Sequence, residues 1–151
     1  MVIVPLPSEV GAYLHEQIPI SAAMGVEVLA CSAEGVRLRA PLAANLNHRA
    51  TVFGGSASAV AILAAWTWLH FALRHAGHPS RVVIQRNEME YIAPIDGDFT
   101  AECEALSPAD FEKMLRTLRR YGKARATLEA RLLLRGQVAA RFAGDYVAVA
   151  M

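Results

Sequence analysis

The chain has 151 residues, of which 54% are hydrophobic and 19% charged, a composition that excludes intrinsic disorder and permits a buried core. Its formal net charge of +1 provides no overall field toward nucleic acid or a membrane surface. The two cysteines are far apart in the sequence and predict reduced thiols. The five histidines lack metal-ligand spacing, so we expect neither a metal nor another cofactor. The first ten residues lack the basic segment and apolar run of a secretory signal, so we expect a single cytoplasmic domain over residues 1–151.

The first predicted elements are a short helix and a hairpin. Ser8 follows Pro7 as a candidate N-cap, and Ile18-Pro19 marks the end of this helix. Two strands at 26–31 and 36–40, separated by a polar turn, then form the hairpin.

The longest uncharged run in the sequence covers residues 50–73. If mostly helical it would extend about 32 Å, which is enough to cross a bilayer. Its many alanines, its Gly54-Gly55 entry and the strands of alternating polarity that follow favour a central helix packed against a sheet. We therefore expect no membrane span.

The second half of the chain alternates between strand and helix patterns. We expect strands at 81–92 and 99–105 around a turn at 94–98, with the acidic side chains of the second strand facing outward. Helical spacing runs from the N-cap candidate Ser107 to Gly122, and two long strands at 123–134 and 137–149 follow, with a candidate bulge at Gly144. This order predicts an α+β fold, with about four antiparallel strands after the buried helix.

Three segments carry a resemblance to a known family. The loop 47–55 reads NHRATVFGG and enters the uncharged helix, while the strand 88–94 reads EMEYIAP and Gly97-Asp98 comes shortly after it. Together they resemble the hotdog-fold thioesterases, and the loop is similar to the N-x-x-x-T-x-H-G-G segment of small thioesterases related to phenylacetate catabolism. Most similar overall is the thioesterase domain that forms the C-terminal half of some bacterial acetyltransferase fusions. That likeness covers nearly the whole chain and includes Asn45, Asn47, Thr51, Phe53-Gly54-Gly55-Ser56, Trp66 and Tyr121-Gly122-Lys123-Ala124-Arg125.

The resemblance implies a hotdog fold, with a long central helix wrapped by an antiparallel sheet. It also implies an acyl-CoA or acyl carrier protein thioester hydrolase that assembles as a homodimer or a dimer of dimers. Two departures from the family pattern affect the chemistry. Phe53 stands where better-known families have the loop histidine, and Ile62 or Leu63 stands where they have the helix carboxylate. The usual general base is therefore missing. A non-catalytic acyl-thioester binder and a hotdog hydratase or dehydratase remain as alternatives, although no His-plus-acid site for the latter is found.

Thioester hydrolysis needs a polarised carbonyl and a positioned water. A backbone N–H at a helix N-terminus can polarise the carbonyl, which favours Gly55. Asn47 and Thr51 can hold a water, although they scarcely deprotonate it, and a carboxylate from another strand or subunit is the other candidate. The predicted catalytic residues are Asn47, Thr51 and Gly55, and the predicted substrate-binding residues are Asn45, Phe53, Gly54, Ser56, Lys123 and Arg125.

Plainer interpretations exist for several of these residues. Asn45 and Asn47 also suit turns that bond their own backbone, and Glu88 and Glu90 suit a solvated strand face. A local cationic cluster could hold coenzyme A phosphates or an acidic carrier protein, or could be an ordinary solvated helix face. No aromatic platform accompanies that charge, so we expect no nucleic-acid partner. The cluster consists of Lys113, Arg116, Arg119, Arg120, Lys123 and Arg125.

Overall fold

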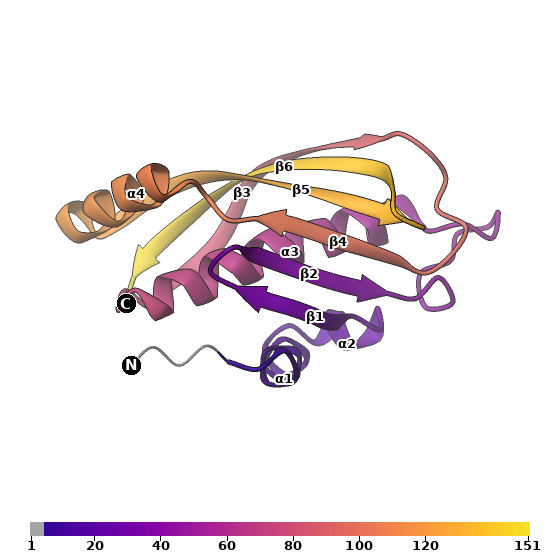
Figure 1. The fold of residues 1–151 in the computed structure, drawn as a ribbon, viewed down its shortest axis with the longest axis horizontal. Coiled ribbons are helices and arrows are strands. Elements are labelled where there is room, and N and C mark those ends of the chain that lie inside the picture. Colours follow the sequence, from indigo (N-terminus) through magenta and orange to yellow (C-terminus); the bar gives the residue numbers. More distant parts are fainter. Residues whose placement is uncertain (1–4) are drawn as a thin grey trace.

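A computed structural model of the protein describes residues 5–151, so the first four residues of the stretch interpreted above for targeting lie outside it. Six antiparallel strands form one sheet in the order β1-β2-β4-β5-β6-β3. The sheet lies over one long helix, α3, and α4 lies at one end of it (Figure 1). The strands are β1 (Glu27–Ser32), β2 (Gly35–Ala40), β3 (Ser80–Tyr91), β4 (Phe99–Glu104), β5 (Lys123–Leu134) and β6 (Gln137–Ala150). The helices are α1 (Pro7–Gln17), α2 (Pro19–Ala23), α3 (Gly54–His75) and α4 (Pro108–Tyr121).

The uncharged run forms a buried core helix. Within residues 5–151, α3 is the one helix long and apolar enough to cross a membrane, and its buried small and aliphatic side chains pack beneath the sheet. The helix begins at Gly54, four residues later than the start of the uncharged run, because residues 50–53 belong to the preceding loop. A long central helix against a six-stranded antiparallel sheet is the predicted hotdog fold.

Strand alternation separates the two faces of the sheet. In β5, Leu128 and Leu132 are buried toward the core, whereas Arg125 and Glu129 are exposed on the face away from α3. The predicted bulge at Gly144 is wrong, since Gly144 pairs with Asn87 and with Leu128 in regular register. A Cβ at Gly144 would lie 2.6 Å from the Phe142 ring, so this glycine makes room for a core side chain.

The helix ends show where capping signals succeed and fail. Ser107 caps α4 by accepting a hydrogen bond from the Asp110 N–H at 3.1 Å, and Gly122 ends the helix with φ 71°, as predicted. Ser8 is not the N-cap of α1, because the helix begins at Pro7 after Leu6. Pro19 ends α1 and then occupies the first turn of α2, where a missing N–H costs nothing, and this short helix was not predicted.

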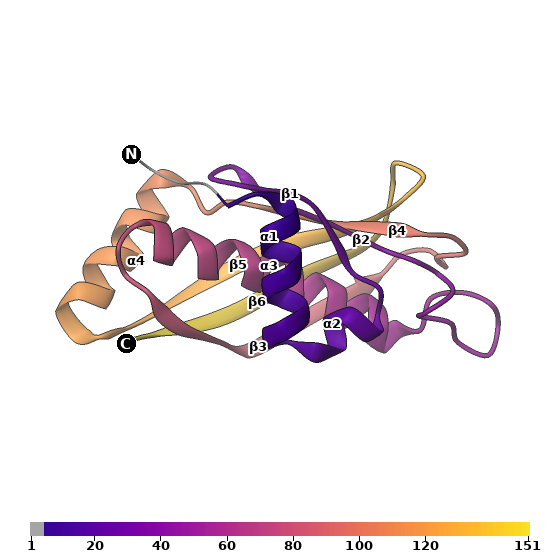
Figure 2. The same ribbon diagram turned by 90° about the horizontal axis from the view of Figure 1, so that it is seen from below.

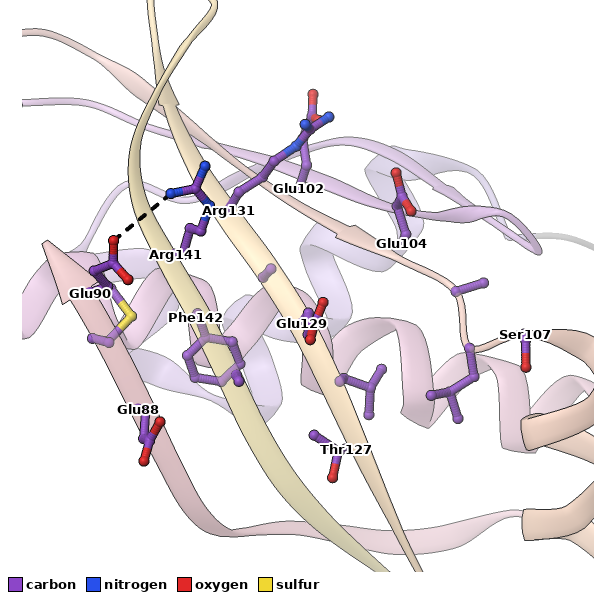
Figure 3. A pocket seen from close by; sticks show the side chains of 16 residues that line it. Glu88, Glu90, Glu102, Glu104, Ser107, Thr127, Glu129, Arg131, Arg141 and Phe142 are labelled. Carbon is purple, nitrogen blue, oxygen red and sulfur yellow. Dashed lines mark hydrogen bonds and ion pairs between the residues drawn. The ribbon is translucent and has the colours of Figure 1, made fainter. Parts of the chain in front are cut away.

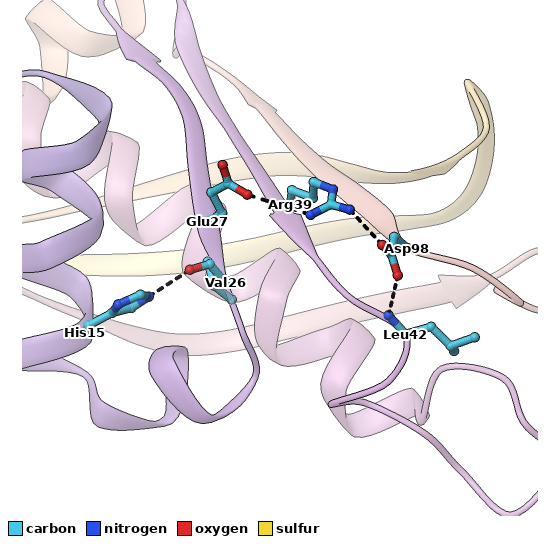
Figure 4. A network of polar contacts seen from close by, with 6 residues as sticks. All are labelled: His15, Val26, Glu27, Arg39, Leu42 and Asp98. Carbon is cyan, nitrogen blue, oxygen red and sulfur yellow. Dashed lines mark hydrogen bonds and ion pairs between the residues drawn. The ribbon is translucent and has the colours of Figure 1, made fainter.

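A polar network holds the segment that leads to α3 (Figure 4). The Asp98 carboxylate accepts hydrogen bonds from the Arg39 guanidinium at 2.7 Å and from the Leu42 N–H at 2.9 Å. Arg39 also lies 3.7 Å from Glu27 on the neighbouring strand. The turn before β4 is thereby joined to the end of β2, which fixes the start of the loop to the helix.

The helix α1 runs across α3 (Figure 2). Tyr13 of α1 stacks on His70 of α3 with ring centroids 5.2 Å apart, and His70 in turn stacks on Trp66 at 4.6 Å. These aromatic side chains therefore serve packing between α1 and α3.

Candidate functional site

The loop that enters α3 is a small hairpin over residues 45–53. Phe53 N–H donates to the Asn45 carbonyl at 2.8 Å, Leu46 and Val52 form a bridge, and Asn47 N–H donates to the Thr51 carbonyl at 2.8 Å. The Val52 N–H also donates to the carbonyl of Ile95 at 2.8 Å. The loop is therefore fixed both across itself and to the turn that precedes β4.

Asn45 anchors the base of this loop. Its side chain is only 2% exposed, and its amide nitrogen donates to the carbonyls of Met24 at 2.9 Å and Pro41 at 2.7 Å. Its Oδ1 is buried with no partner among residues 5–151. These bonds fit the turn-residue interpretation of Asn45, in which the side chain organises backbone.

Asn47 and Thr51 are brought together in this loop, and Thr51 lies three residues before the start of α3. The Asn47 amide nitrogen donates to Thr51 Oγ1 at 2.7 Å, and its Oδ1 accepts from the N–H groups of Arg49 at 2.8 Å and Thr51 at 3.1 Å. The Thr51 hydroxyl thus accepts one bond and keeps its own proton to donate. About 7 Å of extended chain separates Thr51 from Phe53.

The N-terminus of α3 presents backbone donors that are unpaired among residues 5–151. Ala57 is the first helix residue whose N–H bonds back into the turn, to the Phe53 carbonyl at 3.0 Å. The amides of Gly54, Gly55 and Ser56 precede it and have no acceptor inside the helix, and the helix dipole adds positive potential there. Phe53 is 57% exposed, and its ring occupies the space that a Cβ on Gly55 would need.

Tyr91, the last residue of β3, contacts the N-terminus of α3. Its hydroxyl donates to the Gly54 carbonyl at 2.9 Å, although 37 residues separate the two in sequence. A mainly apolar hollow of about 350 Å³ lies beside them. It is lined by Val52, Gly54, Ala57, Tyr91, Ile92, Ala93, Pro94, Ile95 and Ala139, of which Tyr91 alone has a titratable side chain.

The helix positions where related families carry a carboxylate are apolar and occupied by packing. Leu63 is buried, and the backbone carbonyl of Ile62 accepts a hydrogen bond from the Tyr146 hydroxyl at 2.6 Å. Burial raises the pKa of Tyr146 well above its usual range, so this phenol stays protonated. Neither position offers a general base.

The predicted cationic residues lie at the other end of the sheet. Lys123 pairs with Val149, which pairs with Arg81 at the start of β3, whereas Tyr91 ends β3. Ten residues of strand span about 33 Å, so one chain does not bring Lys123 or Arg125 to the N-terminus of α3. The cations of α4 lie at this same far end (Figure 1).

A larger hollow of about 770 Å³ lies over the outer face of the sheet (Figure 3). Its charged side chains include Arg131 and Glu102, which are 3.0 Å apart, and Arg141 and Glu90, which are 3.9 Å apart. These are ion pairs between strand residues, of which Glu102 is half-buried and the other three are exposed. The N-terminus of α3 is the better candidate because backbone donors, a hydroxyl and an apolar hollow meet there.

Sequence reasoning missed the contribution of Tyr91 and of the residues around it. The segment Tyr91-Ile92-Ala93-Pro94 was noted only for its family likeness, and that likeness was the available signal. Ala139, from β6, had no signal at all. Its carbonyl accepts hydrogen bonds from the N–H groups of Ile92 at 2.9 Å and Ala93 at 3.1 Å, which shapes the wall of the hollow.

Comparisons with known proteins agree with this fold. Residues 8–150 match the family model described as "Putative thioesterase (yiiD_Cterm)". The chain is similar to a protein of unknown function from Chlorobaculum tepidum TLS, with 27% identity, 95% of this chain and 93% of that chain covered, and a TM-score of 0.89. A structure from Shewanella oneidensis described as a "putative thioesterase" shares 26% identity over 95% and 96%, with a TM-score of 0.85. A "probable thioesterase" from Pseudomonas aeruginosa, at 24% identity over 98% and 99%, has a TM-score of 0.81 and supports the fold.

Proposed function

Because the chain belongs to the family described as "Putative thioesterase (yiiD_Cterm)", we propose that it hydrolyses acyl thioesters of coenzyme A or of acyl carrier protein. The observation that carries this proposal is that the N-terminus of α3, where the amides of Gly54 and Gly55 have no acceptor inside the helix, borders an apolar hollow that Gly54 lines. The hollow suits an acyl chain, and the amides suit the carbonyl at its end.

In the proposed reaction, the thioester carbonyl oxygen accepts a hydrogen bond from the Gly55 N–H. A water oxygen attacks the carbonyl carbon, a C–O bond forms, and the C–S bond then breaks. The proton lost by the water passes to the departing thiolate. The helix N-terminus stabilises the negative charge on the carbonyl oxygen, and one such donor typically contributes about 10²- to 10³-fold in rate.

Thr51 and Asn47 are proposed to position the attacking water. The Thr51 hydroxyl has a proton to donate, and the Asn47 amide fixes its orientation through the 2.7 Å bond. Both groups are poor bases, so their contribution is geometric. A carboxylate supplied by another subunit is the competing source of the base, and Glu90, exposed beside Tyr91, is its candidate.

A cytoplasmic homodimer formed along β3 is the second part of the proposal. β3 is an edge strand of 12 residues with one unpaired side, and such long free edges are usually covered. Val83 on this strand is 56% exposed, and Trp66 of α3, which donates to the Val82 carbonyl at 2.8 Å, is half-buried next to it. Light scattering at micromolar concentration should give at least twice the mass of one chain, and a strictly monomeric profile would contradict the dimer.

Thiol release from a panel of acyl-CoA thioesters of increasing chain length tests the activity. We expect turnover with a defined preference for chain length. If calorimetry shows that acyl-CoA binds but no chain length is hydrolysed, the chain is a thioester binder. The hollow is lined by neither a carboxylate nor an imidazole, which favours that second function. If neither binding nor turnover occurs, both proposals fail.

A further inference from the structure

The exposed face of α4 carries a stripe of basic side chains. Lys113, Arg116 and Arg120 recur at spacings of three and four residues, so they lie on one face of the helix. The buried residues of α4 lie on the opposite face, which packs against β5. Among residues 5–151, none of these three cations takes part in an ion pair, whereas the neighbouring Arg119 lies 3.6 Å from Glu112.

This stripe is unfavourable for the helix itself. Like charges three or four residues apart repel each other and destabilise a helix, whereas opposite charges at those spacings stabilise it. The negative end of the helix dipole attracts Arg120 in the last turn, but Lys113 lies in the first half of α4, where that attraction is absent. An ordinary solvated face does not need such a pattern, so the stripe favours a role in binding.

The positive charge continues from α4 onto the adjoining end of the sheet. β5 begins two residues after α4 ends, and its first exposed side chains are Lys123 and Arg125. Lys123 pairs with Val149 and Val149 pairs with Arg81, so Arg81 of β3 lies in the same row. These are six of the fifteen basic residues of the chain, which leaves nine against fourteen acidic residues elsewhere. We call the six exposed cations the basic end: Arg81, Lys113, Arg116, Arg120, Lys123 and Arg125.

The shape of the basic end fits a protein surface better than a nucleotide. None of its six cations lines either of the two hollows described above, whereas sites for small ligands are concave. Its side chains are spread along a helix and across strands, and Lys113 to Arg120 alone extends about 10 Å along α4. Such an extended array is matched by a partner whose carboxylates are also spread over a surface.

We propose that the basic end is the docking surface for an acyl carrier protein, whose acidic face it complements. This inference rests on the proposed function, and it narrows the two proposed carriers of the acyl chain to one. Coenzyme A offers only a few phosphate groups, whereas a carrier protein offers an extended acidic surface. Complementary charge of this kind accelerates association and suppresses binding to wrong partners.

The proposed β3 dimer places this surface beside a site. A two-fold axis at the middle of the free edge of β3 pairs two antiparallel strands, so Arg81 of the partner subunit lies close to Tyr91. Three strand spacings, about 14 Å, then separate the β3 of one chain from Lys123 of the partner subunit. A carrier protein docked on one subunit can therefore extend its thioester arm to the N-terminus of α3 in the other.

Arg116→Glu tests the docking surface without weakening the fold. The new carboxylate would lie three residues after Lys113 and four before Arg120, so it replaces repulsion by attraction and the Tm should not fall. The apo form of a bacterial acyl carrier protein, which has no thioester, should bind this variant about tenfold more weakly and R116E/R120E about a hundredfold more weakly by calorimetry. Arg37→Glu is the matched control and should leave the Kd unchanged. Arg37 is an exposed cation on β2 without an ion pair among residues 5–151.

Octanoyl-acyl carrier protein and octanoyl-CoA present the same acyl chain on two carriers. In R116E/R120E we expect kcat/KM for the first to fall by about a hundredfold, through KM, and kcat/KM for the second to change by less than about twofold. Raising the salt concentration from about 50 mM to 500 mM should lower kcat/KM of the unmodified protein for octanoyl-acyl carrier protein, because the charge attraction is screened. The same change should have little effect on R116E/R120E.

Three results would overturn the docking proposal. The apo carrier protein does not bind, or it binds R116E/R120E as tightly as the unmodified protein. In the third, R116E/R120E loses as much kcat/KM for octanoyl-CoA as for octanoyl-acyl carrier protein, which would assign the cations to the phosphates of coenzyme A. Failure of the proposed hydrolysis has a different signature, in which neither thioester is cleaved while the apo carrier protein still binds and its affinity still depends on Arg116.

Discussion

The hydroxyl of Tyr91 donates a hydrogen bond to the backbone carbonyl of Gly54 at 2.9 Å, joining the last residue of β3 to the first residue of α3. This bond connects the strand at the proposed dimer edge with the amides proposed to polarise the thioester. The Tyr91 ring also lies in contact range of Gly54, where a Cβ would approach it to 3.6 Å. The site and the edge strand are therefore mechanically linked.

Tyr91→Phe removes this link and leaves the ring in place. We expect a loss of roughly tenfold in kcat, because misplacement of positioned groups slows the reaction. The free energy of unfolding should fall by only about 0.5–1.5 kcal/mol, as expected for one exposed hydrogen bond. Steady-state thiol release and thermal unfolding measure the two quantities.

Tyr121→Phe provides the matched control for this substitution. Tyr121 is exposed at the end of α4, and its ring lies under the Arg120 guanidinium at 5.2 Å. It lies far from the N-terminus of α3, so its loss of a hydroxyl should not change kcat. Equal rates for both variants and the unmodified protein would show that the Tyr91 bond does not position the site.

Ala93→Leu should narrow the hollow without disturbing the core, because Ala93 is exposed at its rim. We expect the preferred acyl chain to become shorter, with an increase of roughly tenfold in KM for the longest chain that the unmodified protein accepts, since a few buried methylenes contribute that much. Ala109→Leu, an equally exposed site on α4, is the control. An unchanged chain-length profile would place the acyl chain elsewhere.

His70 predicts a dependence of stability on pH. Burial, assisted by the charge of Arg74, lowers the pKa of His70 from 6.5 to about 4. Its ring stacks between Trp66 and Tyr13, and its Nε2 is buried without a partner among residues 5–151. Between pH 6.5 and 4, His70 is protonated in the unfolded chain but neutral in the folded chain. The free energy of unfolding should therefore decline as pH falls from 6.5 toward 4.

His70→Phe keeps the stacking and removes the titrating group. Thermal unfolding at pH 7.5 and pH 5 should therefore show a smaller loss for this variant than for the unmodified protein. An identical loss in both would assign the pH dependence to other groups.

Much of the fold follows from local patterns. The alternation in β5 and the cap and stop of α4 at Ser107 and Gly122 predict these elements almost to the residue, because each signal acts within a few residues. Signals with two meanings mislead, as Pro19 both ends α1 and begins α2. Gly144 suggests a bulge in the sequence, but the structure explains this glycine by the Phe142 ring, which occupies the space that a side chain would need.

The site is predictable only in part, for a related reason. Asn47 and Thr51 lie four residues apart in one loop, so the sequence alone could place them together. Tyr91 reaches Gly54 only through the packing of β3 beside α3, which no local pattern encodes. The distance of Lys123 from the loop likewise depends on the register of β5 and β6, which is a property of the whole sheet.

The comparison of Asn47→Ala with Glu90→Gln tests the proposed site most directly. Asn47→Ala frees the Thr51 hydroxyl and should lower kcat by on the order of 10- to 1,000-fold, with KM and the folded state retained. Glu90→Gln should be mild, because this side chain is exposed and only 3.9 Å from Arg141 in a weak ion pair. A collapse of kcat in Glu90→Gln, with Asn47→Ala nearly as active as the unmodified protein, would contradict the account and assign the base to a carboxylate supplied across a subunit boundary.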